Sequence, residues 1–540
     1  MQKSGKLELT WVGKYEEKEI EPRILVENPE LSYGEQDVGN MLIHGDNLIA
    51  LKALEQDYAG QIKCIYIDPP FNTGAAFEHY DDGLEHSIWL DLMRRRLVIL
   101  YNLLREDGCI FVNLDDSESA YCKILLDEVF GRNNYLNEII VATNKSFGFK
   151  STSDGIFKQA NHVLFYAKDK ERFTINSKKL FIEKSYDTAY NLIFLNTDEP
   201  EEKWVWRNIR EVVAEQLGFE SVRNATAEMG KDFDTEVASF ALSNAERVFQ
   251  LASVTGGALQ KRKNTIEYSK NHKDLLVRHP NDDMDYLFIG GRRVIPYSDR
   301  IIEIDGALVP GELITDIWDD ISIEGLAKEG NVDFPKGKKP EKLIQRCIEL
   351  TTEEGDYVLD SFAGSGTTAA VAHKMQRKYI TIELGQQAYT HCKVRLDAVV
   401  KGEQTGISKA VNWKGGGGYK FYELAPSLLV PNPKIPSIKQ INPEYTFEQL
   451  CEAICKIEGF KYKPEGNMHG RSSEKRFIHI AKDFVNGEYV NSILSMIADD
   501  ESVLIYGTKI QSGLRLPSNV QVKKIPKDLL DKCTFESEVR

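Results

Sequence analysis

Several common sequence signals are missing from this chain of 540 residues. The eight cysteines are scattered, many lie within apolar runs, and none forms a Cys-x-x-Cys pair. This pattern favours reduced core cysteines over a disulfide framework or a zinc site. The apolar runs are far shorter than a membrane span, and residues 1–6 contain no apolar stretch typical of a secretory signal. We therefore expect a cytoplasmic protein with no membrane partner and no metal site.

An excess of positive charge is also missing. The formal net charge is −15 and the pI is near 5.4, whereas a protein that binds a polyanion over its whole surface is usually basic. Nucleic-acid binding then requires a local basic cleft on an otherwise acidic surface. No Walker-type loop occurs either, so the chain is not expected to be a nucleotide-driven motor.

The most informative stretch follows the apolar run Cys64-Ile65-Tyr66-Ile67 and consists of Asp68-Pro69-Pro70-Phe71. An apolar run that stops at an acid and two prolines predicts a buried strand whose carboxyl end opens into a rigid loop. The prolines remove two backbone donors, so the loop offers carbonyl oxygens beside one carboxylate and one aromatic ring. Such a pocket suits a flat ligand with an amino group, such as a flipped nucleobase. An ordinary turn after a strand is the alternative.

A glycine turn lies far down the chain, between a predicted strand that ends at Asp360 and a predicted helix. The turn is Phe362-Ala363-Gly364-Ser365-Gly366-Thr367, and the helix begins at Thr367. Its glycines allow close backbone approach, and N–H groups at the helix start can hold a carboxylate or phosphate. The next strand ends in Glu383, an acid suited to two ribose hydroxyls. The turn is neither Gly-x-x-x-x-Gly-Lys-Ser/Thr nor Gly-x-Gly-x-x-Gly, so it indicates another nucleoside-containing cofactor; a turn that only serves packing is the alternative.

Both motifs lie in segments where predicted strands and helices alternate, which predicts an α/β fold with a parallel sheet. The predicted segments are an N-terminal arm (1–40), a first core half (41–144), a loosely patterned insert (145–315), a second core half (316–425) and a small α+β module (426–540). A proline-rich linker after residue 425 marks the last boundary.

Together the two motifs resemble those of the DNA amino-methyltransferases, which use S-adenosylmethionine. The catalytic motif comes first, the cofactor motif last, and a large insert separates them, an order that resembles the β class. The resemblance covers roughly residues 40–425. It implies a doubly wound, mainly parallel, Rossmann-like sheet in circularly permuted order, with an inserted target-recognition region. Asp-Pro-Pro-Phe-Asn-Thr-Gly, the length and the C-terminal module resemble, more narrowly, the modification subunits of type III restriction–modification systems.

The resemblance implies a role for each motif residue on the catalytic side. Asp68 and the backbone carbonyl of Pro69 would accept the hydrogens of adenine N6, while Pro70 completes the loop and Phe71 stacks on the extruded base. Two acceptors on these hydrogens pull the nitrogen toward tetrahedral geometry and direct its lone pair at the methyl group. An Asp in place of Ser at the first motif position resembles adenine enzymes more than cytosine-N4 enzymes.

On the cofactor side, the resemblance assigns the methionine part to the glycine turn, with its ammonium on Asp360. It assigns the ribose to Glu383 and the adenine to Asp46. The segment with Phe334, Lys339 and Pro340 resembles the one that closes over the cofactor.

The resemblance also implies partners and leaves alternatives. Double-stranded DNA would be the substrate, and basic groups in the insert, such as Lys145, Lys150, Lys158 and residues 261–263, would contact it together with nearby aromatic rings. A homodimer and a separate restriction (translocase–nuclease) subunit are expected partners, with the arm and the C-terminal module as candidates for those contacts. The alternatives are methylation of cytosine N4 or of RNA, a non-catalytic DNA-binding module, and a dinucleotide-dependent oxidoreductase.

Overall fold

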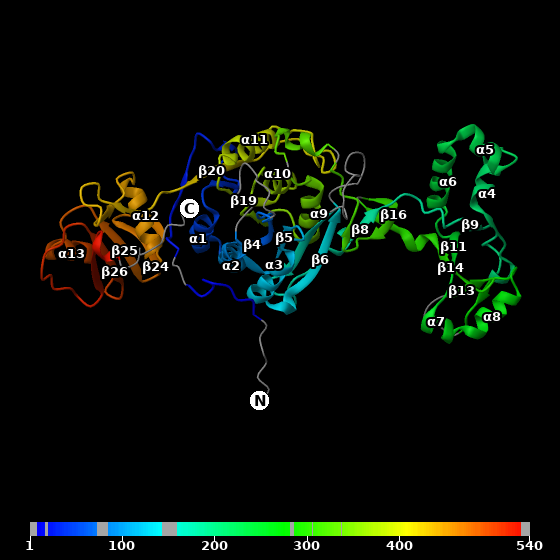
Figure 1. The fold of residues 1–540 in the computed structure, drawn as a ribbon, viewed down its shortest axis with the longest axis horizontal. Coiled ribbons are helices and arrows are strands. Elements are labelled where there is room, and N and C mark those ends of the chain that lie inside the picture. Colours follow the sequence, from blue (N-terminus) through cyan, green and yellow to red (C-terminus); the bar gives the residue numbers. More distant parts are fainter. Residues whose placement is uncertain are drawn as a thin grey trace, which may run out of the picture. The chain divides into compact units, whose positions relative to one another are not determined.

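The computed structural model describes residues 8–16, 20–72, 85–142, 159–280, 286–304, 306–323, 325–335 and 337–530. The chain divides into two units (Figure 1). One unit consists of Met1–Asn176 with Asp316–Arg540, and the other consists of Ser177–Thr315. The predicted Lys145, Lys150 and Lys158 lie outside the described residues.

The first unit is built around one large sheet. Its strands are β1 (Leu25–Glu27), β2 (Tyr33–Gly34), β3 (Met41–His44), β4 (Ile62–Ile67), β5 (Leu104–Leu114), β6 (Tyr135–Ala142), β7 (Ala160–Ala167), β17 (Ile317–Trp318), β18 (Tyr357–Asp360), β19 (Lys378–Glu383) and β20 (Gly418–Leu424). They lie in the order β1-β20-β3-β19-β18-β4-β5-β7-β6-β17, with β2 paired to β20. All pairs from β20 to β5 are parallel, and β7 runs antiparallel between β5 and β6. The predicted α/β fold with a mainly parallel sheet is confirmed.

Helices pack on the sheet in two groups. The first group is α1 (Asn47–Tyr58), α2 (His86–Leu103) and α3 (Ser119–Leu126), and the second is α9 (Glu341–Thr351), α10 (Thr367–Lys374) and α11 (Val394–Val400). The helices of each group contact one another. Ile65 and Ile67 of β4 share a core cluster with the first group, whereas Cys64 and Tyr66 alternate with them along the strand and lie outside that cluster. Since successive side chains of a strand point to opposite faces, and α9 also contacts β4, the sheet is covered on both faces.

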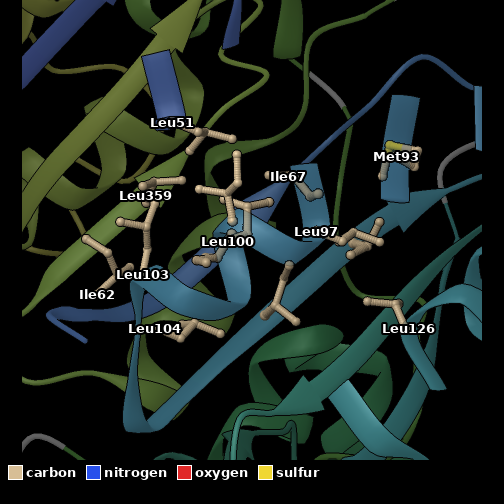
Figure 2. Packing of buried hydrophobic residues seen from close by; sticks show 14 of the residues in the cluster. Leu51, Ile62, Ile67, Met93, Leu97, Leu100, Leu103, Leu104, Leu126 and Leu359 are labelled. Atoms are coloured by element: carbon tan, nitrogen blue, oxygen red, sulfur yellow. The ribbon is translucent and has the colours of Figure 1, made fainter. Parts of the chain in front are cut away.

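The first group of helices is held by the apolar face of α2. Figure 2 shows Leu97, Leu100 and Leu103 of this helix near Ile62 and Ile67 of β4, and all five side chains belong to one buried cluster. Burying a leucine side chain contributes about 1.5–3 kcal/mol. The helix is therefore fixed firmly beside the strand that carries Asp68.

The start of the inserted unit differs from the predicted residue 145. Strand β7 pairs with both β5 and β6 and thus completes the core sheet. The second unit begins at Ser177, after this strand. The functional roles assigned to the five predicted segments stay predictions.

The second unit contains two antiparallel sheets, in the orders β10-β9-β11-β14-β13-β12 and β15-β16-β8. Its strands are β8 (Phe181–Glu183), β9 (Leu192–Phe194), β10 (Trp206–Asn208), β11 (Val248–Ala252), β12 (Val277–Arg278), β13 (Leu287–Ile289), β14 (Arg292–Pro296), β15 (Ile301–Ile304) and β16 (Ala307–Leu313). Its helices are α4 (Ile209–Gln216), α5 (Val222–Met229), α6 (Lys231–Ser243), α7 (Gly256–Lys261) and α8 (Lys263–Asn271). It has apolar clusters of its own, one of them around Phe233 and Tyr297.

The C-terminal residues of the first unit form a mixed sheet in the order β23-β24-β25-β26-β27, beside the small pair β21-β22. The strands are β21 (Leu429–Pro431), β22 (Lys439–Ile441), β23 (Lys461–Glu465), β24 (Met468–Ser473), β25 (Arg476–Ala481), β26 (Ser502–Gly507) and β27 (Val520–Lys524); the helices are α12 (Phe447–Ile457), α13 (Gly487–Leu494) and α14 (Lys527–Leu530). A capping box of Thr446 and Gln449 begins α12. These elements have the α+β character expected of residues 426–540.

Three further features concern the described residues only. No helix there is long and apolar enough to cross a membrane. The cysteines found there are buried and free: Cys64, Cys109, Cys122, Cys347, Cys392, Cys451 and Cys455. No group of three or more His, Cys, Asp or Glu residues in this part of the chain could hold a metal ion.

Candidate active site

The two sequence motifs meet because their strands are neighbours in the sheet. Strand β18 pairs with β4, Leu359 opposite Ile65, and with β19 on its other side. The carboxyl ends of these parallel strands therefore carry Asp68, the glycine turn and Glu383 along one edge. From β18 the chain continues outward to β19, and from β4 it continues outward to β5 on the other side. Ligands of such sheets usually bind where the strand order reverses in this way, at the carboxyl ends of the strands.

Asp68 is held by two side chains from distant parts of the chain. Asn113 Nδ2, on β5, donates to Asp68 Oδ1 at 2.8 Å, and Lys339 Nζ donates to Oδ2 at 2.6 Å. Asn113 is fully buried, so its amide is fixed by packing. The Lys339 Nζ atom also lies 4.8 Å from the centroid of the Phe71 ring. One carboxylate oxygen is thus fixed from the core, while the other faces a flexible cation.

The rest of the loop is fixed through its backbone and Asn72. The Pro70 carbonyl accepts a hydrogen bond from the indole Nε1 of Trp89, a buried residue of α2, at 2.8 Å. Asn72, which has a positive φ of 58°, donates from Nδ2 to Glu118 Oε1 at 2.7 Å. Within the described residues the Pro69 carbonyl has no such donor. The loop is anchored after the buried Pro69 through the Pro70 carbonyl and Asn72.

The glycine turn is tied to the end of β19. Glu383, which is buried, accepts the N–H of Gly364 at 2.8 Å and the N–H of Gly385 at 3.0 Å. Gly366 has φ +73°, and a Cβ added there would lie 3.1 Å from the Cα of Cys392. Only glycine fits that combination of backbone conformation and contact. Glu383 therefore shapes the turn, and its predicted contact with a ribose stays a prediction.

Asp360 comes just before this turn, and its carboxyl group is a weaker acid than that of an ordinary aspartate. Its Oδ1 accepts the backbone N–H of Phe362 at 2.9 Å. Burial raises the pKa of Asp360 to about 7, against the lowering effect of the hydrogen bonds from Thr368 and Phe362. Since burial in a low-dielectric site penalises the charged form, a ligand cation beside Asp360 would relieve that penalty. The predicted contact of Asp360 with the cofactor ammonium stays a prediction.

Asp46 is the N-cap residue of α1. Its Oδ1 accepts the N–H groups of Leu48 and Ile49 at 2.9 and 3.1 Å, and its Oδ2 lies 3.6 Å from the buried Arg96. The neighbouring Asn47 donates from Nδ2 to the Ser361 carbonyl at 2.6 Å. This bond ties α1 to the glycine turn, so Asp46 is placed on the same edge of the sheet.

The segment before α9 touches both halves of the site. The Phe334 ring packs against Gly364. A Cβ added at Gly364 would lie 3.8 Å from the ring, an ordinary van der Waals distance. Lys338 Nζ donates to backbone carbonyls of the preceding segment, among them Val332 at 2.8 Å, and burial lowers the pKa of Lys338 to about 8. Lys339 then reaches Asp68, and Pro340 precedes the helix. Phe334 therefore lies beside the glycine turn and Lys339 beside Asp68, whereas the predicted cofactor contacts of this segment, including Pro340, stay predictions.

A group of fully buried charges supports the start of α10. Glu341 pairs with Lys374 at 2.8 Å and with Arg395 at 2.7 Å, and the three side chains have no exposed surface. Arg395 also donates to Thr367 Oγ1 at 2.7 Å. These bonds fix the helix N-terminus, where Ser365 and Thr367 also share a hydrogen bond at 3.1 Å.

Sequence reasoning missed the residues that position the motifs: Asn113, Trp89, Glu118, Glu341, Lys374 and Arg395. Asn113 carried a signal, since it is a single polar residue within the apolar run of residues 109–114. Glu118, Glu341, Lys374 and Arg395 carried none, because charged residues are usually solvated, and the pattern around Trp89 indicates burial without naming a partner.

A family model described as DNA methylase matches residues 62–393. This chain belongs to the DNA methylase family. Among curated proteins, it is 36% identical over 76% of its length to the "Probable type III restriction-modification enzyme HindVI Mod subunit" of Haemophilus influenzae, of which it covers 58%. It is 27% identical over 66% of its length to the StyLTI Mod subunit of Salmonella typhimurium, of which it covers 52%.

The alignment with a third relative covers almost the whole of both proteins. The chain is 23% identical over 95% of its length to the EcoP15I Mod subunit of Escherichia coli, of which it covers 89%. The first two alignments thus span little more than half of each relative. The family and the recurring Mod names agree with the resemblance of the two sequence motifs.

Proposed function

We propose that this DNA methylase transfers a methyl group from S-adenosylmethionine to N6 of an extruded adenine in double-stranded DNA. The observation that carries the proposal is the meeting of Asp68 and the glycine turn at the ends of the paired strands β4 and β18. A single in-line transfer requires a hydrogen-bond acceptor for the target amine next to the turn that holds the cofactor, because positioning supplies much of the rate.

The catalytic groups act on the amine. Asp68 Oδ2 and the Pro69 carbonyl accept the two N6 hydrogens, and Asn113 keeps the Asp68 carboxylate oriented through Oδ1. The acceptors localise the nitrogen lone pair, which in the free base is delocalised into the ring, and Phe71 stacks on the base. Bound S-adenosylmethionine would supply the methyl group, its carbon–sulfur bond breaking with the electron pair on sulfur, and the methylated nitrogen would lose one proton to solvent.

The cofactor is proposed to lie along the β18 and β19 ends. S-adenosylmethionine supplies an electrophilic methyl group on a sulfonium. Asp360 binds its ammonium, and the turn Phe362-Ala363-Gly364-Ser365-Gly366-Thr367 lies against the methionine part. Glu383 and Asp46 bind the ribose and the adenine, and Phe334 covers the turn. The buried Asp360, with a pKa raised to about 7, is the feature that fits a cationic ligand.

Adenine N6 is preferred over cytosine N4 because Asp68, rather than Ser, begins the catalytic motif. Cytosine N4 is the second candidate, since its amino group presents the same two hydrogens to the same acceptors. Mass spectrometry of nucleosides from the methylated product distinguishes N6-methyladenosine from N4-methylcytidine in their deoxy forms.

The inserted unit is proposed to recognise the DNA sequence. Helix α8 and the residues after it expose Lys263, Lys270 and Lys273 beside Tyr268, which suits phosphate contacts and stacking. The arginines of this region have partners within the unit: Arg262 and Arg293 lie over the Tyr286 ring. The exposed lysines are therefore better candidates for DNA contacts than these two arginines.

We further propose that the chain is a cytoplasmic modification subunit of a type III restriction–modification system. It would act as a homodimer and bind a separate restriction subunit, with the C-terminal residues as the docking candidate. The names of its relatives support this assignment.

The activity is tested with purified full-length protein, S-adenosylmethionine labelled in its methyl group, and duplex DNA of mixed sequence. Label in DNA, recovered as N6-methyldeoxyadenosine, is the expected result. If no label enters DNA either with or without the partner subunits, the proposed activity is wrong. Sequencing the methylated positions then gives the recognised site.

A further inference from the structure

Lys339 forms two contacts that a target amine would form. Its Nζ donates to Asp68 Oδ2 at 2.6 Å and lies 4.8 Å from the centroid of the Phe71 ring. Both side chains of the ion pair are mostly buried, with 14% and 19% of their surface exposed. The contact is thus an enclosed one, and solvent screening weakens it less than it would weaken a surface pair.

An ammonium and an amino group on a flat ring are alike in what they require from this site. Each offers N–H donors to a carboxylate, and each is attracted by an aromatic face, the ammonium by cation–π interaction and the base by stacking. Asp68 Oδ1 is already bound by the buried Asn113. Oδ2 is therefore the oxygen for which the two donors contend.

We propose that Lys339 is a positioning residue whose ammonium competes with the target amino group for Asp68 Oδ2. The inference rests on the proposed function and adds a step to base binding. Lys339 holds the carboxylate in place until the base enters, and the amino group then replaces the ammonium. Base binding exchanges one charge-assisted hydrogen bond for another, so the amino group adds little net affinity in the wild type.

The position of Lys339 in the chain gives it room for this exchange. Its segment has Phe334 against the glycine turn and Lys338 fixed on backbone carbonyls. The Lys339 backbone is therefore anchored next to Lys338, while the four-carbon side chain can rotate.

The test compares two duplexes that carry the recognised sequence and differ only in the target base. One holds adenine, and the other holds purine, which lacks the amino group. Fluorescence anisotropy gives the two dissociation constants for full-length protein, with and without S-adenosylhomocysteine. The quantity of interest is their ratio, purine over adenine, because the weaker pairing of purine in the duplex affects every variant equally and cancels between variants.

In the wild type the ratio of the dissociation constants, purine over adenine, is expected to be low, because the amino group adds little net affinity. In Lys339→Met, Asp68 lacks its internal donor, and the ratio is expected to rise about tenfold or more. Lys339→Arg retains a cation and keeps the ratio close to wild type. In the double variant Asp68→Asn with Lys339→Met the rise disappears, which shows that it arises at Asp68 rather than from altered folding.

A ratio in Lys339→Met equal to that of the wild type, with and without S-adenosylhomocysteine, overturns the inference. That failure differs from failure of the proposed function. In the latter case wild-type protein transfers no label to the adenine duplex at all, whereas here the wild type methylates normally and only the dependence of binding on the amino group is unaffected by the substitution.

Discussion

The β4 side and the β18 side of the site are held by different kinds of bond. On the β4 side, Asp68 is positioned by two side chains, Asn113 and Lys339. On the β18 side, the turn is positioned by backbone N–H groups bonded to Glu383, and the helix behind it begins on the fully buried Arg395. The side that is proposed to meet changing DNA bases thus has exchangeable contacts, and the side proposed to hold a constant cofactor has fixed ones.

This difference predicts different consequences for substitution. Changes beneath the β18 side should reduce folding stability, because they remove a partner from buried charges or place a side chain on strained backbone. Changes around Asp68 should reduce the rate of transfer and leave the fold nearly intact.

The largest effect is expected for Glu341→Ala. This change leaves Lys374 and Arg395 buried without their shared carboxylate, which costs about 3–5 kcal/mol of the unfolding free energy. Denaturant unfolding followed by circular dichroism measures it. The control is Glu354→Ala, a change at an exposed position, which should alter the unfolding free energy by less than about 0.5 kcal/mol. Equal effects of the two changes would mean that the buried charges do not support the β18 side.

Gly366→Ala comes second and has a matched control in Gly60→Ala. Both glycines have positive φ, +73° and +70°, but an added Cβ at Gly366 lies 3.1 Å from Cys392 Cα and one at Gly60 meets nothing within 4 Å. The control should cost about 1–2 kcal/mol from the backbone alone, and Gly366→Ala should cost about 1 kcal/mol more from the close contact. The same unfolding experiment tests both; a smaller loss at Gly366 than at Gly60 would contradict the described turn.

On the β4 side, Asn113→Ala should act on the rate. Losing the donor to Asp68 Oδ1 leaves the carboxylate free to rotate, and kcat should fall about tenfold to a hundredfold. Affinity for S-adenosylmethionine, measured by isothermal titration calorimetry, should stay close to wild type. Asn102→Ala, at an exposed position of α2, should leave both quantities unchanged. Loss of cofactor binding together with kcat would show that the two sides are not separate.

The smallest effect is a pH dependence of cofactor binding through Asp360. Its pKa of about 7 lies above its ordinary value of 3.8, so the folded protein binds this proton more tightly than the unfolded chain. Its contribution therefore makes folding stability fall as pH rises from about 4 to about 7. A bound ammonium favours the carboxylate, so cofactor affinity should instead increase with pH in this range.

Between about pH 6 and pH 7.5 the affinity of the wild type for S-adenosylmethionine should rise about fivefold to tenfold. Asp360→Asn removes the titrating group, and its affinity should be nearly constant across the same interval. Calorimetry at each pH provides the comparison. A wild-type affinity independent of pH would separate Asp360 from the cofactor ammonium.

Local patterns in the sequence were enough to predict the strand ends and the two motif turns. An apolar run before Asp68 and a glycine turn after Asp360 are signals contained within a few residues, and the sheet does place them on neighbouring strands. The contacts that hold these motifs were not predictable, because the two partners of each contact are remote in the sequence. Asn113 is 45 positions from Asp68, and Lys339 is 271 positions away.

The role given to Lys339 illustrates the limit of motif reasoning. Resemblance assigned Phe334, Lys339 and Pro340 together to the cofactor, since a motif carries no information about which way each side chain turns. Phe334 does lie against Gly364, but the Lys339 ammonium turns toward Asp68. The ion pair with Asp68 sets the direction of the Lys339 side chain, and only the fold determines which charged residues come together.

The central claim is that Asp68 handles the amine while the β18 side holds the cofactor, and Asp68→Ala tests it most directly. Single-turnover transfer of labelled methyl to DNA should fall by a factor of about a hundred to a thousand or more. Cofactor affinity, measured by calorimetry on the same preparation, should remain close to wild type. Transfer at the wild-type rate, or loss of transfer that is accompanied by loss of cofactor binding, would contradict the account.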